Sequence, residues 1–178
     1  KTLSSITQAG LVNNLNDGMI WGLLPILLIQ QNLDNQAIGI ITALYPSVWG
    51  PPQLFTGKLA DIYPKKQMLF WGMFLQGIAI ICLIISPLFF VLAGLSVLLG
   101  IGTALVYPTF LAMIAQETHP QQRAECMGVF RLWRDLGYAF GAIISGIIAD
   151  FWGLDLAILS VGILTLISAG VIQVRMPK

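Results

Sequence analysis

A few polar and charged side chains stand inside long apolar stretches of this sequence, and they are its candidates for chemistry. A charged side chain in the middle of an apolar membrane helix costs on the order of 3 kcal/mol, so it usually faces a cavity or a partner. A carboxyl group there can carry a proton, while amides, hydroxyls and aromatic rings can bind a small solute. The candidates for such a pathway are Asn13, Asp17, Trp21, Thr103 and Tyr107.

A second group of charges, Arg131, Arg134 and Asp135, lies in one later apolar stretch. Arg131 and Asp135 are four residues apart, so they share a helix face and can neutralise one another. Arg134 needs another partner, and Asp17 is its natural candidate, with Asp61 as a competitor. A count of about 1.5 Å per helical residue places Asp17, Tyr107 and this cluster at similar depth, in the cytoplasmic third. Two interpretations stay open, a proton-linked or substrate-linked switch and a structural ion pair.

The elements that must position these residues are hydrophobic helices. Hydrophobic residues make up 57% of the 178 and charged residues only 10%, so the bilayer must be the solvent of this chain. A hydrocarbon core of about 30 Å needs roughly 20 apolar residues per helix, and the alternating pattern of barrel strands is absent. We therefore predict an all-α membrane protein with helices near 8–30, 36–57, 67–86, 88–115, 122–149 and 155–174, the second one interrupted by Pro46, Pro51 and Pro52.

The orientation of these helices follows from lysine and arginine, which cytoplasmic loops carry in excess. The loops around Asp34, around Pro87 and around 150–155 carry neither residue. Both ends of the chain are therefore predicted to be cytoplasmic. The net charge of +1 says nothing about nucleic acid, because the basic residues are spread over the chain rather than gathered into a patch, and we expect no nucleic-acid partner. The basic residues that set the orientation are Lys1, Lys58, Lys65, Lys66, Arg123, Arg175 and Lys178.

One short pattern occurs twice, three predicted helices apart. The second helix ends in Gly57-Lys-Leu-Ala-Asp61, and the fifth ends in Gly146-Ile-Ile-Ala-Asp150. By the predicted topology the two copies lie on opposite sides of the membrane. Three plus three helices in inverted relation are typical of many secondary transporters.

The residues around the first copy carry a resemblance to a known family. The segment 57–66 reads Gly-Lys-Leu-Ala-Asp-Ile-Tyr-Pro-Lys-Lys, and it resembles the G-x-L-A-D-x-x-G-R/K-R/K signature of major facilitator superfamily transporters. Segments 107–112 and 130–138 resemble the fourth and fifth helices of the C-terminal half in bacterial members. Ile62 and Pro64 depart from the pattern, where a basic residue and a glycine are usual. The resemblance covers essentially the whole chain, which lacks an initiator methionine and is expected to be a fragment.

This resemblance implies a fold, a partner and a gate. The fold is one six-helix half built as a 3+3 inverted repeat, and the partner is the N-terminal six-helix half of the same twelve-helix transporter. Asp61 would pair with that other half across a cytoplasmic gate, or would merely neutralise nearby lysines. Gly57 is expected to pack closely at the turn. The residues assigned to the gate and signature are Gly57, Asp61, Lys65, Lys66, Arg131, Arg134 and Asp135.

The predicted function is secondary active transport of a small solute by alternating access, in a bacterial cytoplasmic (inner) membrane. Proton coupling is expected because Asp17 supplies a titratable group and no phosphate-binding glycine loop occurs. A facilitative uniporter and a non-transporting receptor or membrane assembly subunit remain as alternatives. No nucleophile-and-base motif and no metal-ligand spacing occurs, so we expect no enzyme, no metal and no cofactor. The substrate and the direction of transport are not determined.

Two further patterns concern packing. Gly137, Gly141 and Ser145 repeat at intervals of four, which predicts a small-residue face for close contact with another helix. The helices near 67–86 and 155–174 carry few polar groups, and in the resembling family such helices support those that line the cavity.

Overall fold

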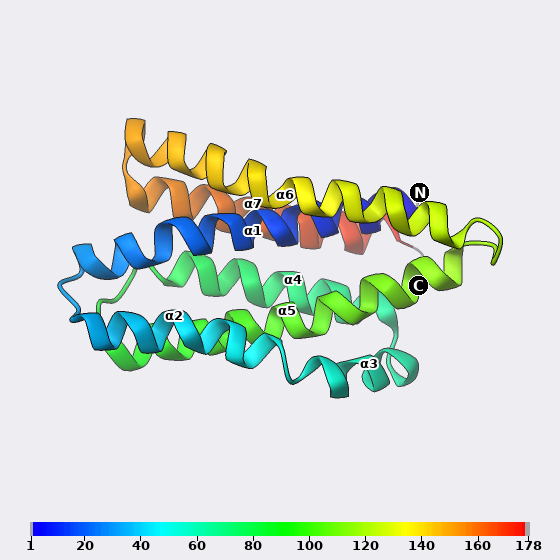
Figure 1. Cartoon of the computed structure of the whole chain (residues 1–178), viewed down its shortest axis with the longest axis horizontal. Coiled ribbons are helices and arrows are strands. Elements are labelled where there is room, and N and C mark those ends of the chain that lie inside the picture. The colour runs from blue at the N-terminus through cyan, green and yellow to red at the C-terminus, as the bar shows by residue number, and fades with distance from the viewer. Residues whose placement is uncertain (1, 177–178) are drawn as a thin grey trace.

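Seven α-helices and no strand make up the part of the chain that the structure describes. This computed structural model describes residues 2–176, apart from the side chain of Asp61, so Lys1 and Lys178 lie outside the described residues. The helices run lengthwise in one elongated bundle (Figure 1). They are α1 (Thr2–Gln30), α2 (Asn35–Trp49), α3 (Gln53–Ile62), α4 (Lys65–Cys82), α5 (Phe89–Glu117), α6 (Arg123–Trp152) and α7 (Leu154–Arg175).

The stretch predicted as one helix near 36–57 is two helices. α2 ends at Trp49, and α3 begins at Gln53 and continues to Ile62. Gly50, Pro51 and Pro52 lie between them. The two prolines have no N–H to donate to the preceding turn, and in a continued helix their rings would clash with its carbonyl groups. Pro52 instead precedes α3, where a missing N–H is tolerated. The other five predicted stretches are occupied by α1, α4, α5, α6 and α7, with α1 beginning at Thr2 rather than near residue 8.

Three of the described helices, α5, α6 and α7, are by themselves long and apolar enough to cross a membrane. α2 and α3 have 15 and 10 residues, so neither reaches the roughly 20 residues that a span requires. α1 is long enough but carries the polar residues Asn13, Asn14, Asn16 and Asp17.

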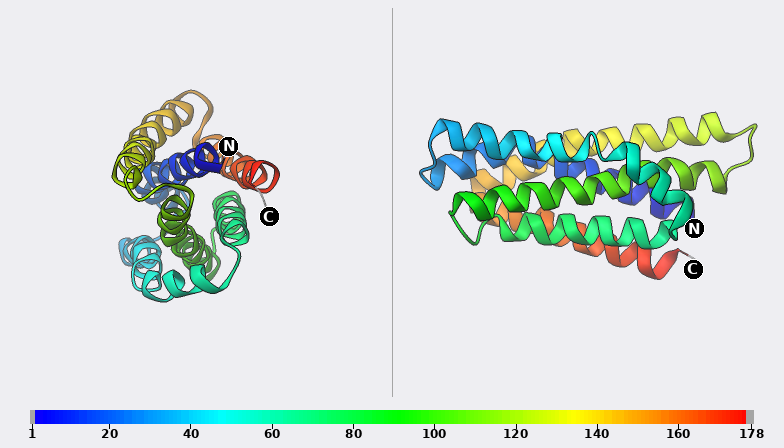
Figure 2. Two further views of the ribbon diagram at one scale, coloured as in Figure 1. Left: turned by 90° about the vertical axis from the view of Figure 1, so that its right-hand side faces the viewer. Right: turned by 90° about the horizontal axis from the view of Figure 1, so that it is seen from below.

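The central helix of the bundle is α1, which packs against α6 on one side and against α7 on another. α4 lies between α5 and α7, while α2 and α3 pack on α5; the end-on view in Figure 2 shows this arrangement. Arg175 donates to the Ser4 hydroxyl over 3.4 Å, so the start of α1 and the end of α7 lie together.

The contact between α1 and α6 depends on glycine. A Cβ at Gly137 would come within 2.3 Å of the Leu11 carbonyl oxygen, and one at Gly141 within 2.2 Å of the Leu15 carbonyl oxygen. Ser145, the third member of this face, is buried. The prediction of a close helix contact along 137, 141 and 145 is therefore confirmed. The rest of α6 is largely exposed, with Phe130 as its only other buried residue.

Candidate functional site

Asp17 lies where four helices meet. It stands in the middle of α1 and is 5% exposed. Its carboxyl group accepts a hydrogen bond from the Tyr45 hydroxyl of α2 and another, at 3.3 Å, from the Tyr138 hydroxyl of α6. The Tyr45 hydroxyl also lies 3.2 Å from the Thr103 hydroxyl of α5. Two phenols from α2 and α6 therefore hold one buried carboxyl group, and a threonine of α5 lies behind the first phenol.

The expected pair between Arg134 and Asp17 does not form. Arg134 instead donates to Asp135, with Nη2 2.7 Å from Oδ1, and this is the one ion pair among the described residues. The expected neutralisation of Asp135 by Arg131 is likewise replaced by this pair, and Arg131 is exposed. From the same helix it is Tyr138, one helical turn beyond Arg134, that donates to Asp17.

The Arg134 side chain turns toward α5 instead of α1. Its guanidinium lies 5.3 Å from the centre of the Tyr107 ring and 5.9 Å from that of Phe130, within the range of a cation–π interaction. The Tyr107 ring in turn lies 6.2 Å from that of Trp49 on α2. Arg134 and Tyr107, which the depth count placed together, are therefore in contact.

The residues predicted to form a pathway fall into three places. The first is the region around Tyr45, which contacts Asp17 and Thr103. Trp21 belongs to it too, because its ring centre lies 6.0 Å from that of Tyr45, although Trp21 is 51% exposed. Tyr107 joins Arg134 at the second. Asn13 is 1% exposed and accepts from the Gln76 amide of α4 over 3.0 Å, so it belongs to neither.

The signature segment spans the end of α3 and the start of α4. Lys66 donates to the Met176 carbonyl oxygen over 2.7 Å, which supplies a cation to the C-terminal end of α7. A Cβ at Gly57 would meet nothing within 4 Å, so the expectation of close packing there is wrong for the described chain. Gly57 instead lies on an open side of α3. The side chain of Asp61, assigned to the gate, lies outside the described residues.

Sequence reasoning missed two residues of this region, Tyr45 and Gln76, as partners of α1. Tyr45 could have been found by counting helical rise from the loop at residues 31–34, which puts it near the depth of Asp17. Gln76 is one of the few polar residues of the helix predicted near 67–86. Nothing in the sequence indicates that it turns toward α1.

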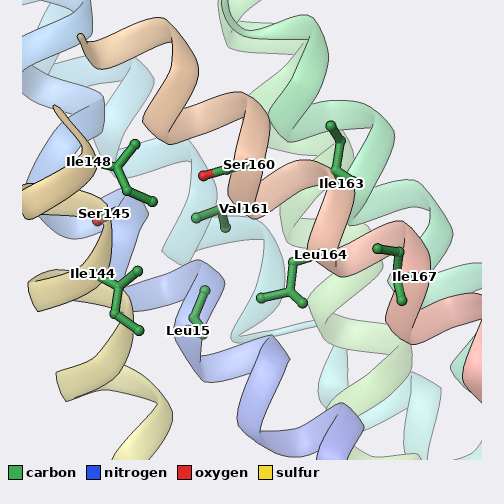
Figure 3. Close-up of a pocket in the computed structure, with 9 residues that line it drawn as sticks. All are labelled: Leu15, Ile144, Ser145, Ile148, Ser160, Val161, Ile163, Leu164 and Ile167. Atoms are coloured by element: carbon green, nitrogen blue, oxygen red, sulfur yellow. The ribbon is translucent and has the colours of Figure 1, made fainter. Parts of the chain in front are cut away.

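Two grooves of the bundle are largely apolar. A groove of about 330 Å³ lies between α6 and α7, with Leu15 of α1 at its base and isoleucines on both walls (Figure 3). Only Ser145 and Ser160 are polar among its lining residues. A second groove, of about 360 Å³, lies between α1 and α2 beside Trp21 and Pro25. Within residues 2–176, no three histidine, cysteine or acidic side chains gather as metal ligands would.

A family model described as Major Facilitator Superfamily matches residues 7–177 of this sequence. The chain belongs to the major facilitator superfamily. Together with the apolar helices α5, α6 and α7, this membership identifies an integral membrane protein. The family also points to transport rather than to an enzymatic reaction, as the sequence predicted.

Curated relatives and solved structures agree with this assignment. The chain is 30% identical over 140 residues to an uncharacterized MFS-type transporter of Methanocaldococcus jannaschii, covering 76% of this chain and 35% of the relative. It is 26% identical over 150 residues to the inner membrane transport protein YnfM of Escherichia coli, covering 83% and 35%. A crystal structure of the peptide transporter POT in complex with sulfate superposes with a TM-score of 0.77 at 19% identity, covering 97% of this chain and 37% of that one. The chain thus spans about a third of the length of these proteins, and the likeness to POT shows the fold.

Proposed function

We propose that the protein is a secondary active transporter that moves a small solute by alternating access, and that this chain is its C-terminal six-helix half. An N-terminal six-helix half of the same transporter would complete it. The length of the relatives, about three times that of the matched region, supports this proposal. The largely exposed surface of the apolar helix α6 supports it too, because such a surface needs protein or lipid to cover it.

The packing pattern supports a 3+3 inverted repeat. α1 packs on α6 as α5 packs on α2, and α4 packs on α5 as α7 packs on α1, while α4 and α7 pack on each other. If α2 and α3 count as one span, α1 corresponds to α5, the α2–α3 pair to α6, and α4 to α7. Exchanging the first three spans for the last three then leaves the pattern of neighbouring helices unchanged. Because lysine and arginine gather in alternate loops, we propose that both ends of the chain are cytoplasmic.

The observation that carries the proposal of proton coupling is the environment of Asp17. No lysine or arginine pairs with it among residues 2–176, and its described partners are the phenols of Tyr45 and Tyr138. A deprotonated carboxylate only accepts hydrogen bonds, whereas a protonated carboxyl group also donates one. A proton that binds or leaves Asp17 would therefore rearrange its contacts with α2 and α6. Such a rearrangement is a means of coupling a proton to helix movement.

We assign the other predicted residues to two regions. Asp17, Trp21, Thr103 and Tyr107 would line the substrate or proton pathway, with Asn13 supporting Asp17 from within the same helix. The gate would comprise Arg131, Arg134 and Asp135 on α6, together with the signature residues Gly57, Asp61, Lys65 and Lys66 of α3 and α4. The exposure of Asp135, whose side chain is 54% exposed, supports a contact with the other half. We propose the cytoplasmic membrane of a bacterium as its location, with the substrate unassigned.

The experiment that tests this proposal is proton flux in liposomes. The full-length protein is reconstituted with a trapped pH dye and challenged with pooled metabolites and drugs, beside the Asp17→Asn variant. Proton movement that requires both a pool and Asp17 is the expected result. An unchanged flux in Asp17→Asn would overturn the coupling role of this residue.

Two other results would favour the alternatives. If a labelled component of a pool crosses while protons do not move, the protein is a uniporter and Asp17 is structural. If nothing crosses with folded protein in the membrane, a receptor or an assembly subunit is the better assignment.

A further inference from the structure

α1 carries a second set of buried polar side chains, which the proposed proton step does not use. These are Asn13, Asn14 and Asn16, each 1% exposed or less. A buried amide without a partner costs about 1–3 kcal/mol, so such groups are normally hydrogen-bonded. Their partners come from three other helices: Gln76 of α4, Thr165 of α7 and Asp135 of α6.

These side chains form one continuous hydrogen-bonded chain. Thr165 donates to Asn16 over 2.7 Å, and Asn16 donates to Gln76 over 3.0 Å. Gln76 donates to Asn13 over 3.0 Å, and Asn13 donates to Asn14 over 3.2 Å. The last and longest contact, 3.5 Å, runs from Asn14 to Asp135. This series of hydrogen bonds therefore runs from the buried Thr165 of α7 to the exposed carboxylate of Asp135 on α6.

All donors in this chain point the same way, toward the negative charge of Asp135. Hydrogen bonds arranged in one sense polarise each other, so each is strengthened by its neighbours. Asp135 also forms the ion pair with Arg134, whose guanidinium lies over the Tyr107 ring. The buried amides are thus connected to the charged residues of the exposed face.

Gln76 has a special place because it holds α1 at two points. Its amide oxygen accepts from Asn16 and its amide nitrogen donates to Asn13, which lie about one helical turn apart on α1. Gln76 itself is fully buried. Rotation of α1 about its axis would break both hydrogen bonds and leave the buried Gln76 amide without a partner.

We infer that Gln76 is a positioning residue that holds α1 in the rotation at which Asp17 meets Tyr45 and Tyr138. Asp17 follows Asn16 directly in the chain, so the rotation of one residue determines the direction of the other. The amide chain ties that rotation to Asp135 on the exposed face of α6. The transport role of Asp17 rests on the proposed function, but its positioning can be measured without a transported substrate.

The test measures how readily Asp17 reacts with dicyclohexylcarbodiimide, an apolar reagent that modifies carboxyl groups within membranes. Full-length protein in phospholipid vesicles is labelled at one pH, and peptide mass spectrometry gives the initial rate of modification at Asp17. In Gln76→Met, which keeps the size and removes both hydrogen bonds, we expect the rate to rise at least threefold. The two phenols no longer hold the carboxyl group when α1 is free to rotate.

Two matched variants separate positioning from general damage. Gln67→Met makes the same replacement at an exposed position of α4, and we expect the wild-type rate. Gln76→Glu in its protonated form offers the one donor and the one acceptor that the amide uses toward α1, and we expect it to restore a rate near wild type.

A wild-type rate in folded Gln76→Met would overturn the inference, and so would an equal rise in Gln67→Met. If Gln76→Met is not recovered as folded protein, Thr165→Val takes its place, because it keeps the side-chain size and removes the first donor of the chain. A rise in its labelling rate supports the inference and a wild-type rate refutes it. Absence of proton flux in the liposome assay would count against the proposed function alone, since the labelling needs no flux.

Discussion

The hydroxyl of Thr56 in α3 donates to the carbonyl oxygen of Ala104 in α5 over 2.7 Å. Ala104 precedes Pro108 by four residues, and Pro108 has no N–H with which to complete the helical hydrogen bond to that carbonyl. Thr56, which is 7% exposed, therefore satisfies the one backbone acceptor that the proline leaves free. Through this bond the segment beyond the break at Gly50–Pro52 is attached to α5 one turn before Pro108.

Thr56→Val keeps the side-chain shape and removes the hydroxyl, so the Ala104 carbonyl is left buried without a donor. We expect the free energy of unfolding to fall by about 1–2 kcal/mol. In the Pro108→Ala background, the restored N–H bonds to the same carbonyl, and Thr56→Val should cost less than half as much. Detergent-denaturant titration of the four proteins of this cycle measures the difference. Equal costs in both backgrounds would mean that the proline and the threonine are not linked.

Gly141→Ala introduces a Cβ where the Leu15 carbonyl oxygen lies 2.2 Å away, so α1 and α6 must separate. Overpacking of this kind costs about 1–3 kcal/mol, and we expect a lower midpoint of thermal unfolding. Gly146→Ala on the same helix is the control, because its Cβ meets nothing within 4 Å. We expect that variant to unfold at or slightly above the wild-type temperature. A similar loss in both variants would point to the helix itself rather than to its contact with α1.

Tyr45→Phe and Tyr138→Phe each remove one phenol from Asp17, but their surroundings differ. Tyr45 is 1% exposed, whereas Tyr138 is 39% exposed and makes the longer hydrogen bond to Asp17, so its loss removes the weaker contact. A hydrogen bond to a charged group contributes about 1.5–3 kcal/mol. We expect Tyr45→Phe to slow substrate-driven proton uptake about tenfold or more, and Tyr138→Phe to slow it two- to threefold. The reverse order in the liposome assay would contradict the proposed arrangement.

Arg134→Gln removes both the ion pair with Asp135 and the cation–π contact with Tyr107, while Arg131→Gln removes an exposed charge of the same helix. The Arg134 side chain is 13% exposed and that of Asp135 54%. Ion pairs that water still reaches contribute about 0–1 kcal/mol, and cation–π contacts at exposed sites about 0.5–1 kcal/mol. We expect Arg134→Gln to lower the free energy of unfolding by about 1 kcal/mol and Arg131→Gln to leave it unchanged. Denaturant titration in detergent checks both values. An effect of Arg131→Gln as large as that of Arg134→Gln would favour the pairing first expected from the sequence.

Much of the fold could be predicted from the sequence because it depends on local composition. Runs of about 20 apolar residues need no knowledge of their neighbours to indicate helices in a bilayer, and the signature at 57–66 indicates the family. The small face formed by Gly137, Gly141 and Ser145 was also predictable, since spacing of four on a helix places residues on one side. The break at Gly50–Pro52 was less so, because Pro25, Pro46 and Pro108 stand inside continuous helices.

The sequence by itself determined that the chain is helical, apolar and a member of its family, and it identified Asp17 as the acid of interest. Only the tertiary structure decided which residues meet. Arg134 pairs with its neighbour Asp135 rather than with Asp17, Asp17 is held by Tyr45 and Tyr138, and Gln76 turns toward Asn13 and Asn16. The physical reason is that each of these partners comes from another helix, and the rotation and depth of that helix follow from glycine contacts and packing along its whole length.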